Sequence, residues 1–240
     1  MMEKCPCAEF CGGCQYQGTE YEKQLEIKQK KVESLLSSFH PVEKIIPCKE
    51  PCFYRNKAQF SFAADEKGRV YSGFYMPKSH MVVPVDECMI CDELISKIMI
   101  SIKTIVIRNH VPVFDEKAKK GFLRHVLIRS SNTGEYMVVL ITGCEFNTKK
   151  ELLLKQIIKF NPEVKTVVQN INGNAGSAVL GKKNIVLYGK GYITDKLCGL
   201  SFRISPASFY QVNAIQTEIL YSEAIKAAQL KKDQILIDAY

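Results

Sequence analysis

The spacing of three cysteines near the start of the chain leaves that segment few ways to fold. Cys5, Cys11 and Cys14 follow the pattern C-x5-C-x2-C, with a Gly-Gly pair between the last two. Glycines allow a tight turn without Cβ clashes, so the flanking thiolates can face one centre and main-chain N–H groups can point at the sulfurs. A metal ion or an iron–sulfur cluster requires such converging thiolates. We therefore expect this segment to surround a bound group whose fourth ligand lies elsewhere in the chain.

The stretch "VDECMICDE" offers that fourth ligand as Cys88 or Cys91. Cys11 and Cys14 could pair with both of them as a zinc ribbon, although the intervening loop is far longer than usual and Cys5 is left over. The spacing favours a second interpretation, in which Cys5, Cys11, Cys14 and Cys88 hold an iron–sulfur cluster. A third is that the cysteines are unrelated small hydrophobic residues. In the cluster interpretation the other cysteines are structural: Cys7, Cys48, Cys52, Cys91, Cys144 and Cys198.

Composition narrows the class of protein. The chain has 240 residues, of which 46% are hydrophobic, enough for one large domain or two small ones. It contains no apolar run long enough to cross a membrane and starts without an apolar leader, so we expect a cytoplasmic protein that binds no membrane. Disulfides are rare in that compartment, which favours metal binding as the use of ten cysteines. The net charge of +8 favours a polyanionic partner.

A helix is predicted directly after the cysteine segment. Thr19 and Glu22 have the spacing of a capping box, which predicts the start of the helix, and His40-Pro41 ends it. Apolar residues recur at helical spacing and should form a buried face. These residues are Tyr21, Leu25, Val32, Leu35, Leu36 and Phe39.

The middle of the chain should be rich in strands, with helices inserted. Alternating apolar residues predict a hairpin over 59–75 that turns at 65–68, and a second over 121–143 that turns at 132–134. Two helices are expected, over 87–107 and 148–160, the second with a capping box at Thr148 and Glu151. Further strands are predicted over 164–171, 184–197 and 200–205.

Basic and aromatic residues interleave in this middle region. In "FYRNKAQF", strand alternation places Arg55 and Lys57 on one face, and in "GFLRHVLIR" it places Arg124 opposite His125. A cationic face with rings suits single-stranded RNA, whose phosphates pair with Arg and Lys and whose splayed bases stack. The alternative is an ordinary polar outer face of a sheet. Arg55, Lys57 and Arg124 are our candidate RNA contacts, whereas His125 is expected to be a hydrogen-bonded structural residue.

The end of the chain reads as the beginning of another domain. Pro206-Ala-Ser208 should enter a helix of about twenty residues, and "QILIDAY" then predicts a short buried strand. A helix followed by a strand that ends on an acidic residue is how a doubly wound nucleotide-binding domain begins. One helix and one strand cannot complete such a domain. We therefore expect the domain to continue in a longer protein, beyond Tyr240.

Six motifs in order resemble one family. "CxxxxxCGGCxxQ", "YRNKAQF", "GFYMPKSHMVVPVDEC", "GFLRHVLIR", "ISPASFYQVN" and "LIDAY" are similar to segments of the RNA uracil-5 methyltransferases that carry an iron–sulfur cluster, and they span nearly the whole chain. The resemblance implies that S-adenosylmethionine contacts Gln211 and Tyr240, and that the catalytic cysteine and the general base lie beyond Tyr240. It further implies a 4Fe-4S cluster on Cys5, Cys11, Cys14 and Cys88.

The resemblance also implies an architecture. We expect an α/β fold, with an α+β central RNA-binding domain and the truncated start of a Rossmann-like methyltransferase domain. The expected parts are a cluster segment at 1–17, a helix at 18–48 that packs on the methyltransferase domain, a central domain at 49–205 and the methyltransferase start at 206–240. The predicted function is methylation of uridine C5 in RNA by a monomeric full-length enzyme, the 240-residue chain itself being inactive. Ribosomal (23S) RNA is preferred to transfer RNA. The alternative is a non-catalytic RNA-binding module that carries a cluster or zinc.

Overall fold

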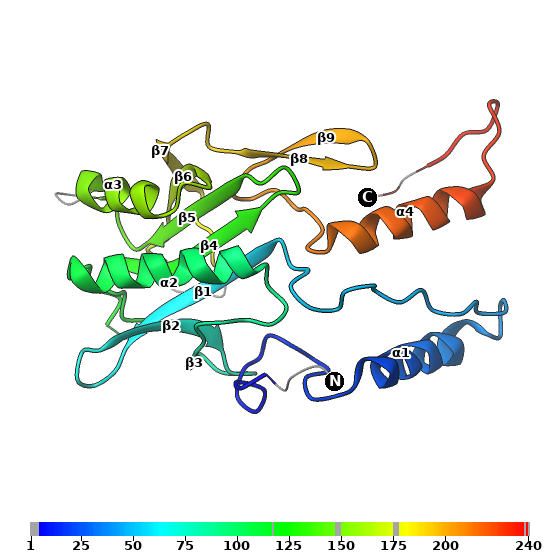
Figure 1. The fold of residues 1–240 in the computed structure, drawn as a ribbon, viewed down its shortest axis with the longest axis horizontal. Coiled ribbons are helices and arrows are strands. Elements are labelled where there is room, and N and C mark those ends of the chain that lie inside the picture. Colours follow the sequence, from blue (N-terminus) through cyan, green and yellow to red (C-terminus); the bar gives the residue numbers. More distant parts are fainter. Residues whose placement is uncertain (1–4, 117, 147–149, 175–177, 238, 240) are drawn as a thin grey trace.

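A mixed α/β fold with a central sheet is confirmed. The structure, a computed structural model, describes residues 5–116, 118–146, 150–174, 178–237 and 239. Among these residues one sheet has seven strands in the order β3-β2-β1-β4-β5-β6-β7 (Figure 1), and its neighbours are antiparallel except for the parallel pair β5–β6. The strands are β1 Lys57–Ala64, β2 Val70–Tyr75, β3 Val82–Pro84, β4 Leu123–Ser130, β5 Tyr136–Thr142, β6 Val164–Ile171 and β7 Lys183–Tyr188.

Both predicted hairpins are confirmed, as β1–β2 and β4–β5. In the first turn the carboxylate of Asp65 accepts the N–H groups of Lys67 and Arg69, each at 2.9 Å. Gly68 and Gly134 supply positive φ angles of 75° and 79°, which glycine adopts without strain. The segment predicted as strand over 184–197 divides into β7 and β8 (Ile193–Leu197), because Gly189 and Gly191 turn the backbone with positive φ.

The core lies on both faces of the central strands. Helices α2 (Glu93–Arg108) and α3 (Lys150–Phe160) cover one face, and the hairpin of β8 with β9 (Leu200–Ile204) covers the other (Figure 1). Val126 and Ile128 of β4 accordingly join the cluster under the helices, whereas Leu127 joins the cluster under the hairpin. Every residue of β4 and β5 is buried for this reason. β5 accordingly reads as a nearly continuous apolar run, whereas β4 also buries Arg124, His125 and Arg129.

Helix α2 starts later than the sequence predicted, at Glu93 instead of near residue 87. The carboxylate of Asp92 accepts the N–H groups of Leu94 at 2.9 Å and Ile95 at 3.3 Å, which makes it the N-cap. The residues before it form the turn that carries Cys88 and Cys91. For α3, the predicted capping residue Thr148 lies outside the described residues.

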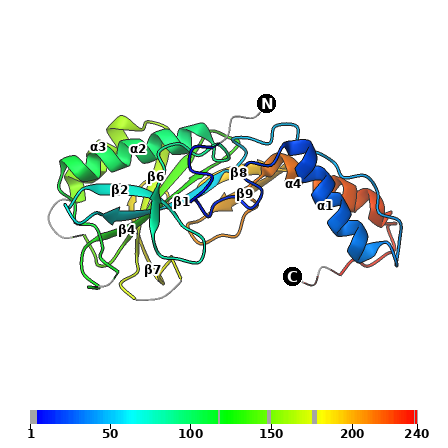
Figure 2. The same ribbon diagram turned by 90° about the horizontal axis from the view of Figure 1, so that it is seen from below.

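Two further helices lie at one end of the molecule, beyond the sheet: α1 (Tyr21–Leu36) and α4 (Ala214–Ala228) (Figures 1 and 2). The predicted capping box of α1 is wrong, because the N-cap residue is Glu20 and makes no side-chain cap. The predicted burial of its apolar face is also wrong. No residue of this fully described helix is buried, and Leu35 is 62% exposed.

The start predicted for α4 at Pro206 is also wrong, because the helix begins at Ala214 after its N-cap Asn213, which accepts the N–H of Gln216 at 3.0 Å. Residues 205–212 take a turn instead, held by Arg129, which donates to the carbonyls of Pro206 and Ser208. The strand predicted near the C-terminus is not formed over described residues 234–237, where Ile235 is 89% exposed. An isolated strand has no neighbour for its N–H and C=O groups. No helix in the described ranges has the length and apolarity needed to span a membrane.

Candidate functional site

The N-terminal cysteine segment folds as a series of turns against the end of β2. The N–H of Gly12 donates to the carbonyl of Tyr75 at 3.0 Å, and a Cβ on Gly12 would lie 2.7 Å from that oxygen. A glycine is therefore required here by close backbone approach. The N–H of Gly13 points at the sulfur of Cys11, at 3.4 Å, as expected for a loop built around thiolates.

The predicted sulfur ligands come together in one cavity of about 380 Å³, between the N-terminal loop, β1 and the turn before α2. Burial, and then the charge of nearby Cys88, raises the pKa of Cys14, which reports how close these two thiols are. Within the described part of the chain, no three His, Cys, Asp or Glu side chains are arranged as a metal-binding group. The ligand sets stay predictions. The cysteines lining the cavity are Cys5, Cys7, Cys11, Cys14, Cys88 and Cys91.

Cys88 and Cys91 differ although they share one turn. The thiol of Cys91 is 1% exposed and packs into the core below α2. Its hydrogen bond to Cys88 lowers the pKa of Cys88 to about 6, against the opposing effect of burial. The same hydrogen bond, together with burial, raises the pKa of Cys91. Cys88 is thus the one of the pair poised as a thiolate, the form that binds metals.

Arg55 fastens the turn of Cys88 and Cys91 to the start of β1. Its N–H donates to the carbonyl of Ile90 at 2.8 Å, and its carbonyl accepts the N–H of Asp92 at 3.0 Å. The residue lines the cysteine cavity. Its charge partly opposes the raised pKa values of Cys14 and Cys91, and it adds a lesser contribution to the lowered pKa of Cys88, which the hydrogen bond from Cys91 dominates. Its Nε is buried with no hydrogen-bond partner among the described residues.

Lys57 lies on the same side of the sheet as Arg55 and also lines this cavity. Arg129 stands opposite Lys57 in the register of β1 and β4. Burial, followed by the charges of Arg129 and Arg55, lowers the pKa of Lys57, so three cations lie close together. The pKa of Arg129 is itself lowered to about 10 by burial. Sequence reasoning missed Arg129 as a member of this group, because only the strand register reveals its neighbour.

Arg124 lies elsewhere and is built into the fold. Its guanidinium donates to the carbonyls of Asn172 at 2.7 Å and Asn174 at 3.0 Å, pairs with Glu116 at 2.6 Å and stacks over Phe114 at 4.7 Å. It is 4% exposed. The predicted RNA contact at Arg124 therefore does not fit this structure, because the charge is enclosed and already partnered.

The next residue, His125, is structural as expected. Its Nδ1 lies 3.1 Å from the hydroxyl of Ser61, and the side chain is buried. Burial, together with the charge of Arg124, lowers its pKa to about 4.

Gln211 lies in the segment between β9 and α4. The side-chain amide of Asn56 donates to the carbonyl of Gln211 at 2.9 Å, and the N–H of Asn56 donates to the carbonyl of Val212 at 3.0 Å. The predicted cofactor segment is thereby attached next to Arg55 and Lys57. Tyr240, the second predicted cofactor residue, lies outside the described residues.

Comparison with protein families identifies a match over most of the chain. The model described as tRNA (Uracil-5-)-methyltransferase matches residues 20–240. Similar curated proteins include uncharacterized RNA methyltransferases of Clostridium tetani, 40% identical over 242 residues, and of Oceanobacillus iheyensis, 38% identical over 241 residues. Each alignment covers 98% of this chain and 52% of the relative. The chain thus spans about half the length of the curated relatives it matches.

A solved structure shares the fold. The crystal structure of Pyrococcus abyssi tRNA (uracil-54, C5)-methyltransferase in complex with S-adenosyl-L-homocysteine superposes with a TM-score of 0.72 at 24% identity. The match covers 92% of this chain and 52% of that one.

Proposed function

Because this chain belongs to the tRNA (uracil-5-)-methyltransferase family, we propose that it forms the RNA-binding part, and one edge of the cofactor site, of an enzyme that methylates uridine at C5. The methyl donor we assign is S-adenosylmethionine, in line with the S-adenosyl-L-homocysteine in the solved relative. Gln211 is the cofactor contact that we assign within the described residues. The chain spans about half of its relatives, so activity and substrate are proposed for the whole protein.

One observation carries this proposal. Arg129 is 4% exposed and already donates to two carbonyls, whereas the cations Arg55 and Lys57 lie where Asn56 is hydrogen-bonded to the segment of Gln211 and Val212. Phosphates that pair with these cations would bring RNA next to the cofactor segment. Arg55 and Lys57 also line the cysteine cavity, so the RNA, cofactor and sulfur sites that we propose would adjoin.

The reaction follows from the weak nucleophilicity of uracil C5. A cysteine thiolate adds to C6, which makes C5 enolate-like, and C5 then takes the methyl group from the sulfonium, releasing S-adenosylhomocysteine. A base removes the C5 proton, and the thiolate leaves as the C5–C6 double bond forms again. The target uridine must be flipped out of its stack to be reached. We assign neither the thiolate nor the base to a described residue of this chain.

The cysteine cavity fits an iron–sulfur cluster in the chemistry of its donors. Cys5, Cys11, Cys14 and Cys88 all line it, and the N–H of Gly13 is directed at one of the sulfurs. We propose that these four would hold a 4Fe-4S cluster, which would join the N-terminal loop covalently to the turn before α2. Zinc on Cys11, Cys14, Cys88 and Cys91 is the competing occupant.

Metal analysis of anaerobically purified protein separates the two occupants. Iron with acid-labile sulfide, lost on Cys5→Ser but kept in Cys7→Ser, is the expected result, because Cys5 belongs to the cluster set alone. Zinc without iron that is lost in Cys11→Ser and kept in Cys5→Ser would contradict the cluster and support the zinc ribbon.

The substrate is tested with RNA from cells that lack the gene. The whole protein and methyl-labelled S-adenosylmethionine should transfer label to RNA, and nuclease mapping locates the 5-methyluridine. We propose ribosomal (23S) RNA as the substrate. Label found only in transfer RNA would contradict this and indicate the class of RNA that the name of the solved relative gives. Lys57→Gln should slow transfer, with Lys67→Gln in the exposed hairpin turn as its matched control. RNA binding without any transfer would leave only a binding module.

A further inference from the structure

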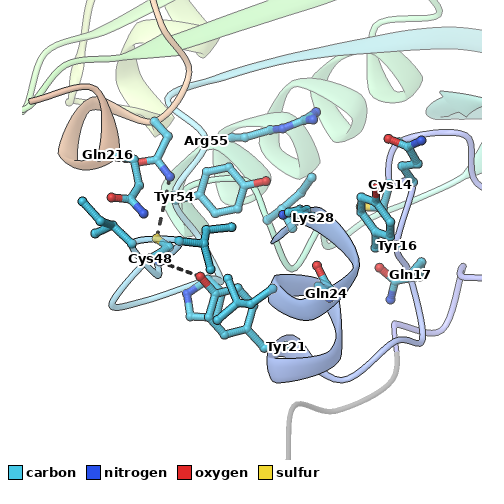
Figure 3. Close-up of a pocket in the computed structure, with 18 residues that line it drawn as sticks. Cys14, Tyr16, Gln17, Tyr21, Gln24, Lys28, Cys48, Tyr54, Arg55 and Gln216 are labelled. Atoms are coloured by element: carbon cyan, nitrogen blue, oxygen red, sulfur yellow. Dashed lines mark hydrogen bonds between the residues drawn. The ribbon is translucent and has the colours of Figure 1, made fainter. Parts of the chain in front are cut away.

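A second cavity, of about 400 Å³, adjoins the cysteine cavity. It lies between α1, the extended segment 45–55, the cysteine loop and the start of α4, and Figure 3 shows side chains from all four around it. Cys14, Gln17 and Arg55 line both cavities. Nothing in the proposed reaction uses the second one.

This cavity is held open by hydrogen bonds and not by an apolar core. The hydroxyl of Tyr21 accepts the N–H of Cys48 at 2.5 Å, and the side chain of Gln29 accepts the N–H of Ile45 at 2.7 Å. These bonds fix the extended segment at a distance from α1. On the opposite side, the amide of Asn213 donates to the sulfur of Cys48 at 3.8 Å. The walls are therefore fixed by specific polar contacts.

The lining has the chemistry of an anion site with aromatic walls. None of the 18 residues around the cavity is Asp or Glu, whereas Lys28 and Arg55 contribute two cations. The ammonium of Lys28 lies 5.4 Å from the ring centre of Tyr16. Arg55 brings a buried Nε without a partner among the described residues. The remaining polar groups are three tyrosines and five amides, namely Tyr16, Tyr21, Tyr54, Gln15, Gln17, Gln24, Asn213 and Gln216.

A nucleotide combines the features that match this lining. Its phosphate is an anion for Lys28 and Arg55, its base offers a flat face to a tyrosine ring, and its edges exchange hydrogen bonds with side-chain amides. A cavity of this volume is large enough for one small ligand. A purely apolar ligand would leave the side-chain amides of Gln15, Gln17 and Gln216 without a partner among the described residues, and a cation would be repelled by both charges.

We propose that this cavity is a subsite for one nucleotide of the RNA, flanking the uridine that is methylated. The inference rests on the proposed function and extends it, because it assigns substrate positioning to α1 and to Tyr54. Arg55 lines both cavities and Lys57 lines the neighbouring one, so RNA phosphates that pair with Lys57 and Arg55 would lead directly to the subsite. Lys28 and Tyr54 are positioning residues here, since neither is assigned to the reacting atoms.

The test is fluorescence anisotropy of the whole protein with a labelled single-stranded RNA 12-mer that contains uridine, titrated at several salt concentrations. Lys28→Gln should weaken binding about fivefold and reduce the slope of log affinity against log salt by about 0.7, the loss of one phosphate contact. Tyr54→Leu should weaken binding by a similar factor of about five through lost stacking, with the salt slope unchanged.

The matched control is Lys30→Gln, which removes the same charge from an exposed position of α1 outside the cavity. It should leave the salt slope at the wild-type value. Lys28→Arg should restore that slope. Thermal unfolding of each variant identifies any that fails to fold. If Tyr54→Leu does not fold, the comparison of Lys28→Arg with Lys28→Gln decides.

The outcomes separate this inference from the function on which it rests. If Lys28→Gln and Tyr54→Leu both bind RNA with the affinity and salt slope of the wild type, the subsite is overturned. The methyltransferase proposal is then unaffected. If the whole protein does not bind RNA, both the subsite and the proposed RNA methyltransferase function are overturned. Binding of free UMP or AMP that the 12-mer does not displace would assign the cavity to a free nucleotide and overturn its role in RNA positioning.

Discussion

Asn56 donates its side-chain amide to the main-chain carbonyl of Gln211 at 2.9 Å. The two residues lie at opposite ends of the sequence of the sheet domain, and the bond joins the start of β1 to the segment that leads into α4. Because the N–H of Asn56 also bonds the carbonyl of Val212, the segment is held at two successive carbonyls. The position of the proposed cofactor contact is thus set by β1.

Removal of the Asn56 amide should loosen this attachment. We expect Asn56→Ala to lower the free energy of unfolding by about 1 kcal/mol, the net value of one hydrogen bond, and to weaken S-adenosylmethionine binding by the whole protein. Urea denaturation and calorimetry measure the two effects. Asn132→Ala, which removes the same side chain from an exposed position of the turn between β4 and β5, is the control. Full cofactor affinity in Asn56→Ala would show that the bond does not position Gln211.

The two adjacent glycines of the cysteine loop should respond differently to alanine. In Gly12→Ala the new Cβ would meet the backbone oxygen of Tyr75 at 2.7 Å, so the loop must move, whereas in Gly13→Ala it meets only the sulfur of Cys11 at 3.4 Å. We expect Gly12→Ala to reduce the metal content of purified protein severalfold and Gly13→Ala to retain it. Elemental analysis measures this, and equal content in both variants would argue against the close approach at Tyr75.

Substitutions of Arg124 and Lys57 should have different effects, the first on stability and the second on RNA binding. Arg124→Ala leaves the carbonyls of Asn172 and Asn174 without their donor, so we expect about 3 kcal/mol of destabilisation in urea and an unchanged salt slope of RNA binding by the folded fraction. Lys57→Gln should do the reverse, with a reduced slope and nearly unchanged stability, because burial already disfavours its charge. A reduced slope in Arg124→Ala would return this residue to the RNA interface.

His125 should make stability depend on pH. Its pKa falls from 6.5 in the unfolded chain to about 4 in the folded protein, through burial. Between these values the unfolded state binds the extra proton, so stability is full above about pH 6.5 and is lost as the pH falls towards 4, by up to about 3 kcal/mol. Urea denaturation across this range gives the free energy of unfolding as a function of pH. The slope of this dependence should be flatter in His125→Asn, by the amount that corresponds to one proton. An identical slope in that variant would assign the effect to carboxylates.

Local patterns predicted the sheet hairpins because their turns carry their own determinants, such as Asp65 and Gly68. They misplaced the start of α4, where tertiary contacts decide. The turn at 205–212 is fixed by Arg129 from a distant strand, and no spacing within "ISPASFYQVN" indicates that partner. The burial predicted for α1 failed for a related reason, since periodicity identifies an apolar face but not what covers it.

The candidate site was predictable in its residue types and less so in its geometry. The four cysteines predicted as cluster ligands line one cavity, but Cys7 and Cys91 line it too, so spacing alone does not separate ligands from neighbours. The failure at Arg124 and the omission of Arg129 have one cause. Both residues occupy β4, whose two faces are covered, and sequence alternation cannot distinguish an arginine that braces a loop from one that adjoins a site.

The tripeptide Arg55-Asn56-Lys57 has a consequence for how this protein can vary in length. Its three residues are attached to three separate neighbours: the turn of Cys88 and Cys91, the segment of Gln211, and Arg129 in β4. Inserting or deleting one residue would turn every following side chain to the other face of the sheet and break all three attachments at once. Insertions should instead be tolerated in the exposed turn around Lys67. Natural length variation should accumulate there and avoid the tripeptide.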